Sequence, residues 1–220
     1  MTPSSETTRS AAQVRSHFRR AAQSFDSLYD EDGFLQRKLR PGLRTRRDVA
    51  LSVVDSYDGP RVLDVGCGSG RIAENVLEHG ASAYVGIDFS EPMLDLARER
   101  LQRFESKVEL VCGDFRDEPL EGKFEVVLGL GLFDYLPDAQ PFAQRMGEVC
   151  SGAVVASFPA WNWFKGPIRK TRYELINKVP IFDYTEDGVR RMFLSSGFAR
   201  VEFVRPGSSG FIARAYVSAP

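Results

Sequence analysis

The stretch VLDVGCGSG, residues 62–70, decides the fold because it joins an apolar run to three closely spaced glycines. A short apolar run that ends in turn residues is typical of a buried strand in a parallel sheet. Gly66, Gly68 and Gly70 let the chain turn sharply and let a ligand approach the backbone where a helix starts. The stretch therefore predicts a strand, a tight loop and a helix that together hold a nucleotide-like ligand.

Segments of the same kind recur along the chain. Short β-branched runs alternate with helical stretches near 70–79, 91–104 and 138–150, and this alternation indicates βαβ units and a parallel sheet. After a further helix over 186–195, the runs 198–204 and 210–217 are close enough to pair as an antiparallel hairpin. The strands predicted in the parallel part are 61–65, 83–88, 107–111, 124–129 and 152–158.

Three aspartates stand at or near the ends of successive predicted strands. A dinucleotide dehydrogenase carries G-x-G-x-x-G, whereas this loop reads G-x-G-x-G, and the Asp64 carboxylate would repel a pyrophosphate but attract an ammonium group. Asp88, 18 residues beyond Gly70, can accept hydrogen bonds from both hydroxyls of a ribose. Asp114 follows the third strand and can accept from an adenine amino group. One ligand with an ammonium group, a ribose and an adenine accounts for all three positions.

Four motifs resemble those of the class I S-adenosylmethionine-dependent methyltransferases of the small-molecule type. They are VLDVGCGSG, YVGIDFS at 84–90, CGDF at 112–115 and FEVVLGLGLFDYLPD at 124–138, and the resemblance covers roughly residues 60–217. It implies an α/β fold: a Rossmann-like three-layer sandwich around a seven-stranded, mostly parallel sheet of order 3-2-1-4-5-7-6, with strand 7 antiparallel and lid helices at the N-terminus. The implied domains are a tail and helical lid over 1–57 and a methyltransferase domain over 58–220, with a substrate cap at about 159–184.

The same resemblance implies a cofactor and a reaction. S-adenosylmethionine donates a methyl group to oxygen or nitrogen of a small-molecule acceptor by in-line displacement, and S-adenosylhomocysteine is the product. The resemblance implies that Asp64, the glycine loop and the Leu130 carbonyl hold the methionine end of the cofactor. It implies that Asp88 holds the ribose, and that Phe89, Met93 and Asp114 contact the adenine. The implied cofactor residues are Asp64, Gly66, Cys67, Gly68, Asp88, Phe89, Met93, Asp114, Phe115 and Leu130.

Three residues are hypotheses for acid-base chemistry. Asp134 and Tyr135 follow the fourth strand, where many relatives carry functional polar residues, although the aspartate also fits a helix cap. His17 lies on the predicted lid. Metal assistance is disfavoured, because the fifth strand leads into FPAWNWF without the Asp-Asn pair of the magnesium-dependent relatives, so the prediction is a reaction without metal.

The predicted cap combines aromatic and basic side chains. One hypothesis is an aromatic pocket with a basic rim for a flat or lipid-like acceptor that carries an anionic group; the other is an amphipathic helix with a solvated cationic face. Tyr29 belongs to a lid segment whose aromatic faces can close over a sulfonium. The predicted substrate residues are Tyr29, Trp161, Trp163, Arg169 and Arg172.

Composition narrows the class of partner. The 220 residues carry 29 basic and 30 acidic side chains, so no basic excess favours a nucleic acid. The three scattered cysteines and the lack of a long apolar run predict a reduced, cytoplasmic protein without a membrane span. A small-molecule substrate is the expected partner, and the sequence leaves the oligomeric state open. The alternatives are a non-catalytic cofactor-binding regulatory partner and, less favoured, a methyltransferase acting on RNA or protein.

Overall fold

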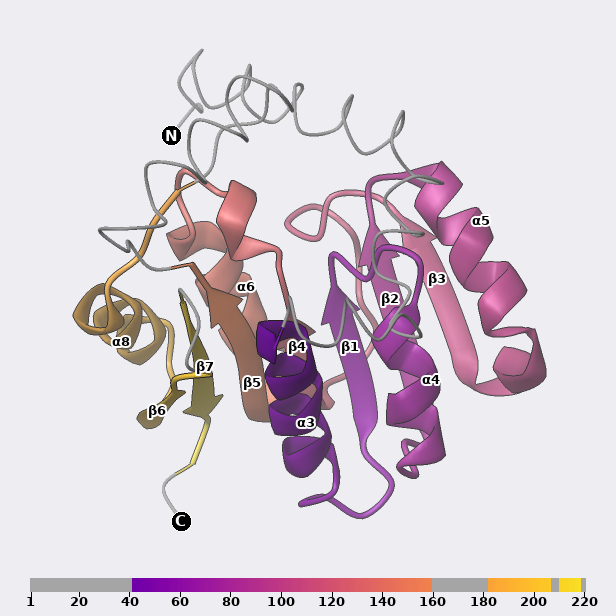
Figure 1. Ribbon diagram of the computed structural model, residues 1–220, viewed down its shortest axis with the longest axis horizontal. Coiled ribbons are helices and arrows are strands. Elements are labelled where there is room, and N and C mark those ends of the chain that lie inside the picture. Colours follow the sequence, from indigo (N-terminus) through magenta and orange to yellow (C-terminus); the bar gives the residue numbers. More distant parts are fainter. Residues whose placement is uncertain (1–40, 160–181, 207–209, 219–220) are drawn as a thin grey trace.

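The computed structural model describes residues 41–159, 182–206 and 210–218, and these residues form a seven-stranded sheet between layers of helices (Figure 1). The strand order is β3-β2-β1-β4-β5-β7-β6. Neighbouring strands from β3 to β5 pair in parallel, whereas β7 runs antiparallel to both β5 and β6. The strands are β1 (Arg61–Val65), β2 (Ala83–Asp88), β3 (Val108–Cys112), β4 (Phe124–Gly129), β5 (Cys150–Phe158), β6 (Arg200–Val204) and β7 (Phe211–Tyr216).

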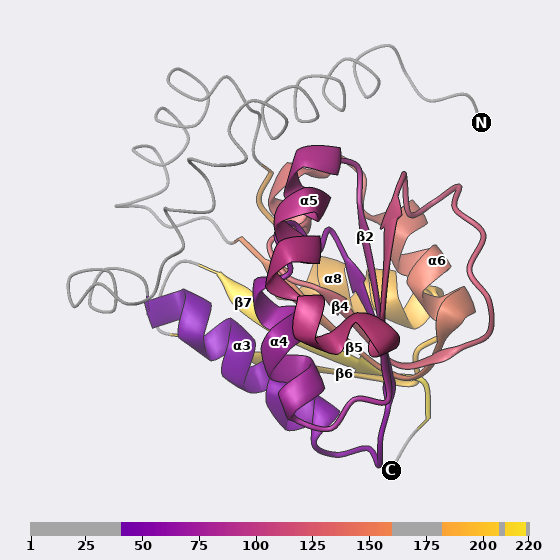
Figure 2. The same cartoon turned by 90° about the vertical axis from the view of Figure 1, so that its right-hand side faces the viewer.

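Helices cover both faces of the sheet and bury two apolar clusters (Figure 2). Because alternate residues of a strand point to opposite faces, β1 sends Val62 to one cluster and Leu63 and Val65 to the other. We call the first the α3-face cluster, which α3, α4 and α5 cover; α6 and α8 cover the opposite face. The helices are α3 (Pro41–Val54), α4 (Arg71–Glu78), α5 (Glu91–Arg100), α6 (Gln140–Val149) and α8 (Glu186–Ser195).

The strand order and the reversed direction of β7 confirm the predicted fold. In the register of the β5–β7 pair, Val155 lies opposite Arg214, and β6 pairs with the other edge of β7, which makes it an edge strand among the described residues. The hairpin predicted from 198–204 and 210–217 is therefore the β6–β7 pair. Its second strand inserts between β6 and the parallel part of the sheet.

The predicted 91–104 helix is shorter in the structure. α5 ends at Arg100, and Gln102–Lys107 form a separate 3₁₀ helix, η1. The break is at Leu101, whose φ of −93° and ψ of 8° lie outside the α-helical region. The turn at this point returns the chain to the start of β3, so the length of α5 is set by where β3 must begin.

Helix α3 belongs to the sandwich. Ala50 and Val54 are fully buried in the α3-face cluster, and α3 lies against β4 and β5. The helix begins at Pro41, where the missing amide hydrogen is tolerated because first-turn amides have no partner within a helix. The end of the segment assigned to a lid thus covers a sheet face, and the lid itself stays a prediction for residues outside the described ranges.

Gly86 in the middle of β2 allows close packing beneath the glycine loop. A Cβ at this position would lie 2.9 Å from Cys67 Sγ, 2.9 Å from Leu110 Cδ2 and 3.0 Å from Tyr84 Cε1. We expect Gly86→Val to lower the free energy of unfolding by roughly 2–3 kcal/mol, since three neighbours must move at once. Urea denaturation measures this, with Gly86→Ala as the smaller step; equal stability of all three proteins would contradict the packing described.

Candidate functional site

The loop after β1 is pinned to the end of β2. The amides of Gly66 and Cys67 both donate to the Ile87 carbonyl, at 2.8 and 3.1 Å. The φ angles are 75° at Gly66, 54° at Gly68 and 69° at Gly70. All three lie in the left-handed region that favours glycine. The three glycines from which the sequence predicted a tight turn are therefore required by the backbone conformation of that turn.

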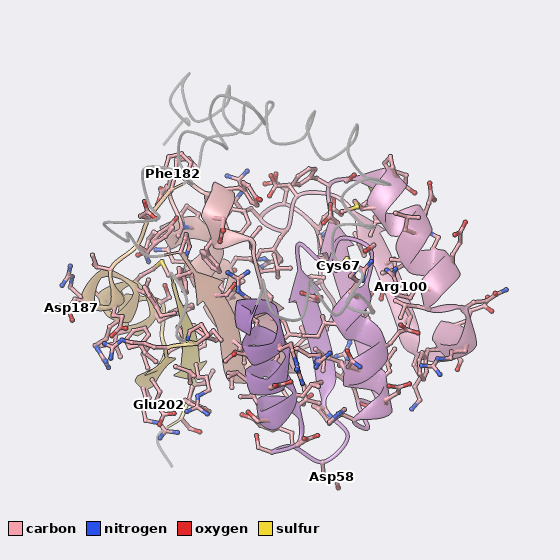
Figure 3. All side chains as sticks on the ribbon, in the orientation of Figure 1. Asp58, Cys67, Arg100, Phe182, Asp187 and Glu202 are labelled. Carbon is pink, nitrogen blue, oxygen red and sulfur yellow. The ribbon has the colours of Figure 1, made fainter. Side chains whose placement is uncertain are left out.

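The last glycine of the loop also lets two helices approach. Gly70 is the residue before α4, and a Cβ there would lie 3.1 Å from Leu101 Cδ1 and 3.2 Å from Ala97 Cβ of the α5 region. The Arg100 guanidinium donates to the Ser69 carbonyl of the same loop (Figure 3). The loop is thus held by β2 on one side and by α5 on the other.

Asp88 joins the loop to the start of α5. Its Oδ2 accepts the Gly68 amide hydrogen at 3.0 Å and its Oδ1 accepts the Ser90 amide hydrogen at 2.8 Å. The side chain is buried. Burial raises the pKa of Asp88, while the amides of Ser90, Gly68 and Phe89 act in the opposite direction. The sequence predicted a carboxylate at this strand end, and the structure places it against the loop.

Asp64 is a buried carboxylate on β1. Its Oδ2 accepts a hydrogen bond from the Tyr84 hydroxyl at 2.8 Å, and its side chain points to the α3 face. Burial raises the pKa of Asp64 to about 7; the Tyr84 hydrogen bond lowers it and the negative charge of Asp88 raises it. Two carboxylates thus lie close enough to affect each other on neighbouring strands.

Cys67 packs as a small apolar side chain. It is buried beside Gly86, and burial raises the pKa of its thiol well above the ordinary value, with Asp64 and Asp88 acting in the same direction. Because the thiolate is the reactive form of cysteine, burial disfavours a nucleophilic role for this thiol. The geometry agrees with the interpretation of Cys67 as a small residue that fits the loop.

Asp114 after β3 is held by Arg116. The guanidinium donates to both carboxylate oxygens, with Nε 2.9 Å from Oδ1 and Nη2 2.6 Å from Oδ2. It also lies over the Phe142 ring, 5.2 Å from the centroid, and Phe115 is buried against the same ring at 6.1 Å. The sequence analysis missed Arg116, although an arginine two residues after the aspartate could have drawn attention to it.

Two apolar residues follow Asp88 at the start of α5. Met93 is buried, and its Cε lies 3.7 Å from where a Cβ at Gly68 would be, so it sits beside the loop. Phe89 is half-buried between Asp88 and Ser90. The structure therefore brings Asp88, Met93 and Gly68 together, and their binding of a cofactor stays a prediction.

The end of β4 meets α3 and β5. Leu130 is half-buried against the α3-face cluster, and the amide of Gly131 donates to the buried Ser157 hydroxyl at 2.8 Å. Arg46 of α3 places Nη1 3.6 Å from the position of a Cβ at Gly131. The sequence analysis missed Arg46 and Ser157, because nothing in their spacing links α3 or β5 to this strand end.

Asp134 and Tyr135 lie in η2 (Phe133–Tyr135), a short 3₁₀ helix beyond β4. The Asp134 carbonyl accepts the Phe182 amide hydrogen at 3.0 Å, so residues far apart in sequence meet here (Figure 3). Tyr184 donates to the Leu136 carbonyl, and burial, followed by the charges of Asp138 and Asp134, raises the pKa of Tyr184. Asp134 thus lies near a tyrosine that the sequence analysis did not consider.

Several predicted residues lie outside the described ranges: His17, Tyr29, Trp161, Trp163, Arg169 and Arg172. Within the described ranges, no group of three or more His, Cys, Asp or Glu side chains is arranged to hold a metal ion. The helices of the same ranges include none with the length and apolar character needed to cross a membrane.

The strand order is that of the Rossmann-like fold found in solved methyltransferases. Residues 62–151 match a family described as a methyltransferase domain. The match runs from β1 into β5 and includes the glycine loop, Asp64, Asp88 and Asp114.

Three similar proteins illustrate the relationship. Magnesium-protoporphyrin O-methyltransferase of Rhodobacter capsulatus is 32% identical over 125 residues, 55% of each chain. Ubiquinone biosynthesis O-methyltransferase of Coxiella burnetii is 30% identical over 121 residues, 53% of this chain and 49% of that one. The chain thus spans about half the length of these curated relatives. The magnesium protoporphyrin IX methyltransferase of Synechocystis PCC 6803, solved with bound SAH, has the same fold, with a TM-score of 0.74, 22% identity and coverage of 94% of this chain and 100% of that one.

Proposed function

We propose that this protein is an S-adenosylmethionine-dependent methyltransferase that acts on a small molecule. The observation that carries the proposal is the Asp88 carboxylate, which is buried at the end of β2 and hydrogen-bonded to the Gly68 and Ser90 amides. Each carboxylate oxygen can accept a second hydrogen bond. Asp88 can therefore receive ribose hydroxyls while it holds the glycine loop in place.

The other residues at the strand ends fit the same cofactor. The Asp64 anion suits the ammonium group of the methionine part, because a buried carboxylate lacks a full counter-charge. Gly68 has no side chain toward Met93, which leaves an apolar wall for the adenine. Asp114 is fixed by Arg116, and a carboxylate at this position suits the adenine amino group, which is a hydrogen-bond donor. When bound, the cofactor supplies a methyl group on a sulfonium.

The chain contributes alignment and proton handling to the transfer. In an in-line displacement, fixing the acceptor against the methyl group can supply much of the rate. We propose that Asp134 and Tyr135, in η2 beyond β4, contact the acceptor, with Asp134 as the base for a hydroxyl proton. The hydrogen bond between the Asp134 carbonyl and the Phe182 amide holds this segment against the chain that returns from residue 182.

The acceptor is proposed from the relatives' names. Both curated relatives are O-methyltransferases, one for magnesium-protoporphyrin and one in ubiquinone biosynthesis. We infer a small acceptor methylated on oxygen or nitrogen, and the relatives favour oxygen. Residues 159–184 remain our proposal for the segment that covers this acceptor, with Trp161, Trp163, Arg169 and Arg172 as its contacts.

A turnover assay tests the proposal. Purified protein is incubated with S-adenosylmethionine labelled on the methyl group and a panel of small carboxylic acids, phenols and amines. We expect S-adenosylhomocysteine to accumulate only when an acceptor is present, with label in that acceptor. An Asp95→Ala variant, altered at an exposed carboxylate of α5, should match the wild type. Tight cofactor binding without label transfer to any acceptor would favour the non-catalytic alternative.

A further inference from the structure

A buried polar pair lies beneath the glycine loop. Tyr84 is fully buried in the α3-face cluster, and its hydroxyl donates to Asp64 Oδ2 at 2.8 Å. In the β1–β2 register Asp64 lies opposite Gly86, so Tyr84 sits two residues back on the same face. A Cβ at Gly86 would lie 3.0 Å from the Tyr84 ring. The absence of a side chain at Gly86 therefore leaves room for the ring beside Asp64.

Packing alone does not explain this hydroxyl. A phenylalanine would fill nearly the same volume, whereas a hydroxyl in an apolar cluster is costly unless it is hydrogen-bonded. Burial, together with the nearby Asp64, raises the pKa of Tyr84 well above its ordinary value, so the hydroxyl keeps its proton and remains a donor. This hydroxyl donates to the carboxylate assigned above to the cofactor's ammonium group.

The other groups around Asp64 disfavour its charge or contact something else. The negative charge of Asp88 on β2 disfavours the Asp64 charge, whereas the Cys67 thiol of the loop keeps its proton and is neutral. On β4, the residue opposite Asp64 is the apolar Leu128. Two arginines of the packed helices lie at other points of the loop and strand ends: Arg46 of α3 is beside Gly131, and Arg100 of α5 donates to the Ser69 carbonyl. Arg71 is the first residue of α4.

We propose that Tyr84 is a positioning residue for the cofactor, whose hydroxyl keeps Asp64 ionised and oriented to receive the methionine ammonium group. This inference rests on the proposed function. A hydrogen bond to the charged form of a carboxylate favours that form, and an ammonium group gains attraction only from the ionised form. Affinity for the cofactor is therefore linked to the ionisation of Asp64, and Tyr84 sets the pH range in which it is strong.

The test is the pH profile of binding for Tyr84→Phe. Calorimetric titration with S-adenosylhomocysteine from pH 5.5 to pH 9 compares the variant with the wild type. We expect the variant to bind roughly tenfold more weakly at pH 6.5 and within about twofold of the wild type at pH 9, because loss of the donor raises the pKa of Asp64 by about one unit. The amino group of the ligand titrates identically in both series. A displacement between the two curves of affinity against pH therefore reports a change in a titrating group of the protein.

Two variants sharpen the result. Tyr57→Phe removes another hydroxyl that packs against the α3-face cluster, from the turn after α3, and should leave the profile unchanged. In an Asp64→Asn background, Tyr84→Phe should cause no further loss, because the group on which it acts is gone. Thermal unfolding of each variant at pH 6.5 and pH 9 confirms that the proteins compared are folded.

The possible outcomes are distinct. A curve displaced to higher pH supports the role of Tyr84. Unchanged affinity, or an equal loss at every pH, would overturn it, since a packing defect does not depend on the ionisation of Asp64. Failure of the wild type to bind either S-adenosylhomocysteine or S-adenosylmethionine at any pH would instead reject the proposed function itself.

Discussion

An Asp88→Ala variant is expected to bind S-adenosylmethionine about 100-fold more weakly than the wild type, or not measurably. The substitution removes the proposed ribose acceptor and, at the same time, the partner of the Gly68 and Ser90 amides. Hydrogen bonds to charged groups contribute roughly 1.5–3 kcal/mol each, so loss of two or more accounts for this factor. Calorimetric titration of the purified proteins measures it.

The same experiment needs a control for folding and for charge. Asp95→Ala removes an exposed carboxylate from α5, where its ion pair with Arg98 is solvent-exposed, and should bind the cofactor normally. Circular dichroism and thermal unfolding show whether the Asp88 variant retains the sheet. A folded Asp88→Ala protein whose affinity stays within threefold of the wild type would refute the assignment of this site.

Asp64→Asn should have opposite effects on binding and on stability. The folded-state pKa of Asp64 is about 7, above its ordinary 3.8, so the folded state holds a proton between these values that the unfolded chain has lost. The contribution of Asp64 to stability therefore falls as pH rises from about 4 to about 7, and its full cost is present at pH 8. Without bound cofactor, we expect the Asp64→Asn variant to have a free energy of unfolding about 2 kcal/mol higher than the wild type at pH 8. We also expect it to lose affinity for the cofactor.

Urea denaturation at pH 8 and pH 5 checks both the size and the sign of this effect. The advantage of the asparagine variant should shrink at pH 5, where the wild-type side chain is already protonated in the folded state. The matched control is Asp95→Asn, which makes the same chemical change at an exposed carboxylate of α5. It should alter the free energy of unfolding little at either pH. A variant that is less stable at pH 8 would mean that Asp64 contributes to the free fold in its charged form.

The fold could be predicted because the sequence patterns that indicate its strands, turns and helices each involve only neighbouring residues. The apolar run of β1, the glycines after it and the alternation of short strands with helices depend on neighbouring residues. The hairpin near the end of the chain revealed the reversed direction of β7 in the same way. The length of α5 was not predictable, because the turn at Leu101 depends on where β3 pairs in the sheet.

The site was predictable only where its residues follow strands directly. Asp64, Asp88 and Asp114 lie at or near strand ends, and parallel strands bring those ends to one edge. Tyr84 was missed because it reads as an ordinary β-strand aromatic until the register sets it beside Asp64. Arg46 was missed for a similar reason, since its approach to Gly131 depends on how α3 packs against the sheet.

The place of β7 has a consequence for how the chain is made. Ribosomes add residues in order, so β5 and β6 are synthesised before β7, the strand that lies between them and pairs with both. Until residues 211–216 are present, β5 has an unpaired edge and β6 has no neighbour in the sheet. The nascent chain therefore exposes an unpaired β edge until β7 has been synthesised and has paired, and such an edge can pair with other chains.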